Sequence, residues 1–269
     1  MTAYAIVGMY LLALVSTVEY YQRARIQRPP LGHFNWRDVL FGLGFIVLMP
    51  FFYLALPVAG VTALFALFWA MLLYSALSPF LRRFPFIVAI LIVVAQYFLR
   101  SPWLADAAVI IIAACVGTTF VKNGLNSREV AAFAVLLMVY DIVFTRFAGL
   151  MMPLMQKLME QPYFIGLVIP GNAMLGGGDV ALSAVFVADM TRHFGRRGGY
   201  LTAVLLVLPM FVLPFLGPAW RTTGIPYLMF ASPVYLAVRG VSGVLKARRT
   251  LAAVSPAPTP TAAPPRTRR

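Results

Sequence analysis

Met174-Leu175-Gly176-Gly177-Gly178-Asp179-Val180-Ala181-Leu182 places an ionisable carboxylate directly after three glycines, at the start of an apolar run. An aspartate near the centre of a bilayer costs about 2.5–3.5 kcal/mol on insertion scales, so such a residue is a candidate for a functional site. A single carboxylate supports few reactions by itself. The other acids of the chain therefore decide what Asp179 can do.

The composition is that of a polytopic membrane protein. Of the 269 residues, 61% are hydrophobic and only 11% are charged, and the mean hydropathy is +0.86. A soluble domain carries about 25% charged residues, because these cover its surface. The net charge of +14 indicates basic cytoplasmic loops and affinity for the anionic lipid bilayer, and we expect no nucleic-acid partner.

Apolar runs predict an all-α fold with nine transmembrane helices, because about 20 residues are needed to span hydrocarbon. The predicted spans are 3–18, 38–57, 60–78, 85–99, 104–121, 129–149, 174–191, 199–216 and 225–245. Between the sixth and seventh, the run at 163–170 lies between two prolines and is expected to be extended or re-entrant. We expect three parts: scaffold spans in 1–128, catalytic spans in 129–249, and a disordered Pro/Arg-rich tail in 250–269.

Basic residues in the loops predict the orientation of the chain in the cell membrane. With the N-terminus outside, the cytoplasmic loops hold Arg23, Arg25, Arg28, Arg37, Arg82, Arg83, Lys122, Arg128, Arg192, Arg196 and Arg197. The opposite loops hold only Arg100, Arg146, Lys157 and Arg221. This asymmetry favours a multi-pass protein with its N-terminus outside and its C-terminus inside.

Most of the eight acids are expected at span ends or in loops. These six are Glu19, Asp38, Asp106, Glu129, Glu160 and Asp189, the last beside Arg192. The two histidines, His33 and His193, are expected to be solvated loop residues.

Asp141 and Asp179 remain. They lie in consecutive antiparallel spans, each about 8–15 Å from the outer end. At equal depth the two carboxylates can meet.

Two carboxylates held close together cannot both ionise, so they share a proton. The ionised one can activate a water molecule while the protonated one polarises a carbonyl group, which is the chemistry of aspartic proteases. The glycines before Asp179 allow a backbone to approach closely and let the helix start unwind to admit water. Water is the nucleophile, so no cofactor and no metal is required.

At these residues the chain resembles the presenilin and signal-peptide-peptidase family of intramembrane aspartyl proteases. The family carries Tyr-Asp in its sixth span and Gly-x-Gly-Asp in its seventh, which correspond here to Tyr140-Asp141 and Gly176-Gly177-Gly178-Asp179. The resemblance is clearest over 129–245. It implies catalysis by the two aspartates, substrate contacts at Tyr140 and the three glycines, and transmembrane peptides as substrates.

The third signature of the family is Pro-Ala-Leu at the start of the ninth span, often followed by proline. Thr223-Gly224-Ile225-Pro226 stands there, and only Pro226 matches. The resemblance implies that Ile225 and Pro226 contact substrate. The predicted orientation is that of signal peptide peptidases. An oligomer is compatible with the sequence, which gives no oligomeric state. By strand addition, the extended run at 163–170 could pair with an unwound substrate.

Two other functions remain open. A prepilin-peptidase-like protease also uses Gly-x-Gly-Asp, commonly followed by Val-Lys-Leu, which resembles Asp179-Val180-Ala181-Leu182 without the lysine. A proton-coupled transporter would use the same intramembrane acids to carry protons. A zinc protease is excluded because no His-Glu-x-x-His motif is present.

Overall fold

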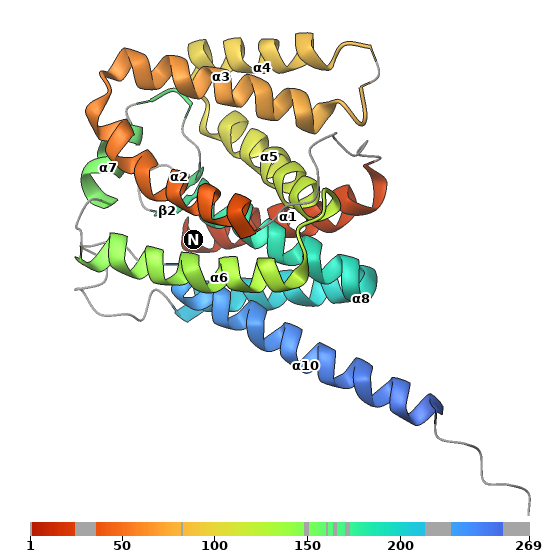
Figure 1. The fold of residues 1–269 in the computed structure, drawn as a ribbon. Helices are drawn as coiled ribbons and strands as arrows, with labels where there is room; N and C mark the ends of the chain where they lie inside the picture. The colour runs from red at the N-terminus through yellow and green to blue at the C-terminus, as the bar shows by residue number, and fades with distance from the viewer. Residues whose placement is uncertain are drawn as a thin grey trace, which may run out of the picture.

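The chain is mostly helical in a computed structural model, with one short hairpin (Figure 1). The structure describes residues 2–24, 36–81, 83–147, 151–159, 161–163, 166–169, 173–212 and 227–254. Its helices are α1 (Thr2–Arg23), α2 (Trp36–Ala55), α3 (Val58–Leu77), α4 (Pro85–Leu99), α5 (Pro102–Lys122), α6 (Ser127–Ile142), α7 (Met151–Met159), α8 (Gly177–Val212) and α10 (Leu228–Val254). The π-helix η1 (Val143–Phe147) extends α6, and β1 (Gly166–Ile169) pairs with β2 (Ala173–Gly176).

The predicted spans agree well with these helices over the first half of the chain. α4 has the predicted bounds, while α2, α3 and α5 differ from the prediction by one or two residues at their ends. Pro102 at the first position of α5 fixes its start, together with the Ser101 hydroxyl, which accepts the Leu104 N–H (3.4 Å). α6 begins with a capping box in which Glu129 accepts the Asn126 N–H at 2.8 Å.

The seventh and eighth predicted spans form one long element, α8, with a break at Gly195. Gly195 has φ +71°, a conformation that side-chain-bearing residues rarely adopt. A Cβ at Gly199 would lie 2.1 Å from the Thr191 hydroxyl, so the chain passes itself closely just after this break. Glycine is therefore required where the two halves of α8 meet.

The segment between the sixth and seventh spans differs from the prediction. It contains the helix α7, which the sequence pattern did not indicate, and the extended run contributes β1. β1 pairs antiparallel with β2, from Gly166 opposite Gly176 to Ile169 opposite Ala173. Residues 174–176 were predicted as the start of the seventh helix and are instead part of β2. The expectation of an entirely α fold is wrong for this hairpin.

Two other predicted regions fall partly outside the described residues. α10 continues through Val254, so the predicted tail starts later than residue 250, and residues 255–269 are not described. Ile225, Pro226, His33 and Glu160 also lie outside the described residues.

Two helices, Val58–Leu77 and Pro102–Lys122, are long and apolar enough to cross a membrane by length and composition. Shorter apolar helices cover Leu40–Ala55, Pro85–Leu99 and Leu228–Val244. α3 has only 22% of its apolar window buried, and large side chains such as Phe41 of α2 and Phe98 of α4 are 78% and 77% exposed. These features indicate a helical membrane protein, and nine spans remain a prediction.

α8 is the central helix of the described bundle, since α1, α5, α6 and α10 all pack against it. Its closest neighbour is α5. A Cβ built on Gly117 of α5 would lie 2.5 Å from the backbone carbonyl carbon of Ala184 in α8, closer than atoms can approach. The two backbones therefore touch at Gly117, as small residues permit in membrane helices.

Gly117→Ala should lower the free energy of unfolding by about 1–3 kcal/mol, because the added methyl group overpacks a contact made by backbone. Gly44→Ala in α2 is the matched control, since a Cβ there meets nothing within 4 Å. Thermal unfolding in detergent would compare the two. Equal melting temperatures for both variants would show that the α5–α8 contact is looser than described.

Candidate active site

Asp141 lies at the end of α6 and is buried, with 7% of its surface exposed. Its Oδ2 accepts the backbone N–H of Leu228 at 2.9 Å, and the Met229 N–H is a further donor. Its Oδ1 accepts the Thr145 hydroxyl at 3.3 Å, from the π-helix that follows α6. The first N–H groups of a helix have no partner within that helix. The carboxylate therefore binds the N-terminus of α10, the predicted ninth span.

Asp179 lies in the first turn of α8 and is half-buried. Its carboxylate accepts the backbone N–H of Gly176, the last residue of β2. A Cβ on Gly176 would approach Asp179 Oδ2 to 3.1 Å, whereas a Cβ on Gly178 would meet nothing within 4 Å. Gly176 thus makes room for the carboxylate. Gly177 begins α8 and is buried.

The structure brings the two predicted aspartates together. α6 packs against α8, and Asp141 is close enough to exert a direct electrostatic effect on Asp179. The two carboxylates have different surroundings, because Asp141 meets a helix N-terminus and a hydroxyl group while Asp179 meets a glycine loop. A pair in unequal environments can divide the acid and base roles of a hydrolysis.

The start of α10 lies beside Asp141, because the Leu228 N–H donates to this carboxylate. Tyr227, directly before α10, is hydrogen bonded to the Leu206 carbonyl (2.5 Å) and to the Tyr10 hydroxyl (2.9 Å). Both tyrosines are within electrostatic range of Asp179. The predicted substrate contacts Ile225 and Pro226 lie outside the described residues.

Tyr140, the predicted substrate contact, has another described partner. Its hydroxyl donates a long hydrogen bond of 3.5 Å to the Ile46 carbonyl of α2, and its ring stacks on Phe144. The residues that contact Asp141 were missed by sequence reasoning, namely Thr145 and the Leu228 N–H. Thr145 could have been noticed as a hydroxyl four residues after Asp141. The backbone donor comes from a helix 87 positions away and has no local signal.

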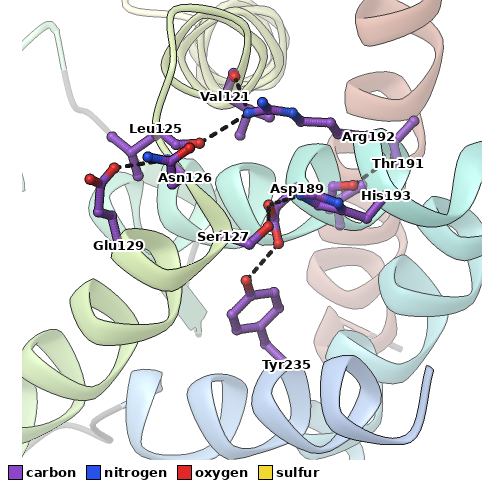
Figure 2. A network of polar contacts seen from close by, with 11 residues as sticks. Val121, Leu125, Asn126, Ser127, Glu129, Asp189, Thr191, Arg192, His193 and Tyr235 are labelled. Carbon is purple, nitrogen blue, oxygen red and sulfur yellow. Dashed lines mark hydrogen bonds and ion pairs between the residues drawn. The ribbon is translucent and has the colours of Figure 1, made fainter. Parts of the chain in front are cut away.

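A second buried carboxylate, Asp189, joins three helices at the other end of the bundle (Figure 2). Asp189 was predicted to be an interfacial charge beside Arg192, but it is fully buried inside the protein. Its oxygens accept the Ser127 hydroxyl of α6 at 2.5 Å and the Tyr235 hydroxyl of α10 at 2.7 Å. His193, predicted to be a solvated loop residue, lies in α8 with Nε2 3.5 Å from Asp189.

Arg192 does not pair with Asp189. Its guanidinium donates to two backbone carbonyls, each at 3.1 Å (Figure 2). The Val121 carbonyl belongs to the last turn of α5, and the Leu125 carbonyl belongs to the loop that follows. A cation at a helix C-terminus is electrostatically favourable and satisfies otherwise unpaired carbonyl groups.

The positions of two other acids, Glu19 and Glu129, agree better with the prediction. Glu19, one residue beyond the predicted first span, pairs with Arg23 at 3.2 Å and also with Arg196. The Tyr200 hydroxyl and then the Arg196 guanidinium lower the pKa of Glu19. Glu129 stands in the first turn of α6, as predicted, whereas Asp106 is buried in α5 and is not an interfacial charge.

Asp189→Ala should lower the free energy of unfolding by about 2–4 kcal/mol, because it leaves the Ser127 and Tyr235 hydroxyls buried without an acceptor. Tyr235→Phe removes one donor and should cost less, about 1–2 kcal/mol. Both values would come from urea or thermal unfolding in detergent. A larger loss for Tyr235→Phe than for Asp189→Ala would contradict the described network.

Comparison with known proteins gives no further information on the roles of these residues. No protein-family model matches the chain, and no curated protein matches it. The presenilin-like assignment is accordingly a proposal that depends on the two motifs and on the geometry of their aspartates.

Proposed function

We propose that the chain is an intramembrane aspartic endopeptidase, similar to the signal peptide peptidases, that hydrolyses peptide bonds within transmembrane segments. One observation carries the proposal: Asp141 and Asp179, from two packed helices, lie within direct electrostatic range of each other. Carboxylates in an apolar bundle are costly, and a structural role for either one alone would not require the other beside it. A shared proton lets the two aspartates act as acid and base in a hydrolysis.

The hydrogen bonds suggest how the roles divide. Asp141 accepts the Leu228 N–H and the Thr145 hydroxyl, and donors of this kind favour the ionised form of a carboxyl group. In the proposed reaction ionised Asp141 removes a proton from the attacking water. Asp179 carries the shared proton and donates a hydrogen bond to the scissile carbonyl oxygen. Asp141 and Asp179 exchange their protonation states when the leaving amine takes up a proton.

The hairpin supports the proposed substrate class. A helical peptide bond is shielded by its own hydrogen bonds, so a transmembrane substrate must become extended before it is cut. β2 runs directly into Gly176 and Asp179, where an extended substrate strand could pair with backbone N–H and C=O groups. Gly178 is exposed and a Cβ there would meet nothing within 4 Å, so a substrate backbone could approach it closely.

The surroundings of the helices support a multi-pass location in the cell membrane. Exposed aromatic and aliphatic side chains on α2, α3 and α4 would be unfavourable in water and suit lipid. Nine spans, with the N-terminus outside and the C-terminus inside, follow from the apolar runs and the distribution of basic loops. The aspartates would then lie in the outer half of the membrane.

Asp141→Ala and Asp179→Ala should each abolish cleavage of a transmembrane peptide by the purified protein in detergent, because neither carboxylate can replace the other. Activity should pass through a maximum with pH and fall on both sides, since one group must be ionised and one protonated. Circular dichroism would verify that each variant is folded. Cleavage at the wild-type rate by either variant would remove the dyad assignment. Proton-coupled uptake into liposomes without any cleavage would favour a transporter.

Gly176→Ala should reduce kcat about tenfold or more, because its methyl group would contact Asp179 Oδ2 and displace the carboxylate by a few tenths of an ångström. Gly178→Ala is the matched comparison, and we expect it to raise KM with a smaller change in kcat, since its methyl group enters open space. Peptide cleavage over a range of substrate concentrations separates the two effects. Identical kinetics for both variants would contradict the different roles.

A further inference from the structure

A cavity of about 490 Å³ lies between the N-terminus of α6 and the middle of α10, and the mechanism does not use it. It is lined by Asn126, Ser127, Arg128, Glu129 and Arg239. Arg239 lies 11 positions after Leu228, about 16 Å along α10 from the N–H that meets Asp141. Ser127 is 14 positions before Asp141, about 21 Å along α6. The cavity therefore lies about 16–21 Å from the proposed dyad along these helices.

The lining has an unpaired positive charge. Among the described residues, neither the Arg128 nor the Arg239 guanidinium has a hydrogen-bonding or ion-pair partner. Glu129 is the one acid of the lining, and one of its oxygens already accepts the Asn126 N–H. The Ser127 hydroxyl is used by Asp189. Two cations against one anion leave the cavity with a formal charge of +1, and the two guanidinium groups are available to a ligand.

The surface next to the cavity is apolar. Val135 and Val139 follow Arg128 by seven and eleven positions, which places them on the same side of α6, and they are 41% and 51% exposed. A cationic cavity beside exposed aliphatic side chains fits a ligand with an anionic head and hydrocarbon chains. In the proposed orientation this end of the bundle lies at the cytoplasmic face, where phospholipid phosphates are found.

We propose that this cavity binds the phosphate of an anionic phospholipid headgroup, held by Arg128 from α6 and Arg239 from α10. Guanidinium groups bind phosphate oxygens through paired, charge-assisted hydrogen bonds. The acyl chains then lie along the exposed Val135 and Val139 of α6. The bound lipid joins two helices that also meet where Asp141 accepts the Leu228 N–H.

Native mass spectrometry of the purified full chain in detergent, titrated with phosphatidylglycerol, tests the site. Arg128→Gln and Arg239→Gln should each weaken the tightest bound lipid about tenfold, because each removes one charge-assisted interaction. Arg197→Gln is the matched control. Arg197 is exposed in α8, carries the same charge and does not line the cavity, so its removal should leave this affinity unchanged. Melting temperatures measured without added lipid would verify folding.

Four results would overturn the proposal. The first is an unchanged lipid affinity in both Arg128→Gln and Arg239→Gln. The second is an equal loss of lipid affinity in Arg197→Gln, which would indicate attraction by general surface charge. The third concerns the source of the phosphate. Inorganic phosphate at millimolar concentration should not displace the lipid, because it lacks the acyl chains, and full displacement would assign the cavity to a soluble anion. Zwitterionic phosphatidylcholine should bind more weakly than phosphatidylglycerol, and equal binding would count against a site for an anionic headgroup.

Discussion

The hydrogen bond from the Leu228 N–H to the Asp141 carboxylate is the contact on which the arrangement of the site depends. A carboxylate buried among apolar helices loses its hydration and must find donors within the protein. The start of a helix offers such donors, since its first N–H groups are unpaired and its dipole favours negative charge. Asp141 and α10 therefore satisfy each other's requirements, and α6 and α10 are fixed relative to one another at the depth of the proposed chemistry.

Asp189 applies the same constraint at the other end of the helices. It accepts hydroxyl groups from Ser127 and Tyr235, so the helix pair joined by Asp141 is joined again through α8. With two polar anchors along α6 and α10, rotation of either helix would break hydrogen bonds at both ends. The backbone contact at Gly117 holds α8 against α5 from the other side. Asp179 is thus held in place by contacts made along the whole of α8.

Much of the fold could be predicted from the sequence because the strongest signal, apolar runs of helical length, is local. The bounds of α4 and the start of α6 follow from Pro85 and from the Asn126–Glu129 capping box. The hairpin could not be predicted, because β2 is a short apolar strand of Ala, Met, Leu and Gly that also fits the start of a helix. The pairing of Asp141 with Asp179 was inferred from depth and the two motifs. The roles of Leu228, Tyr235 and Ser127 depend on contacts between distant segments, which no local pattern contains.

The hydrogen bonds of the two aspartates are compatible with both a structural and a chemical role. An ionised carboxylate has about four acceptor positions. Asp141 uses its positions for the Leu228 and Met229 N–H groups and the Thr145 hydroxyl, which leaves about one for water. Among the described residues, Asp179 accepts one backbone N–H, from Gly176. The residue that is held more tightly therefore orients the site, and Asp179 has more acceptor positions left for water and substrate.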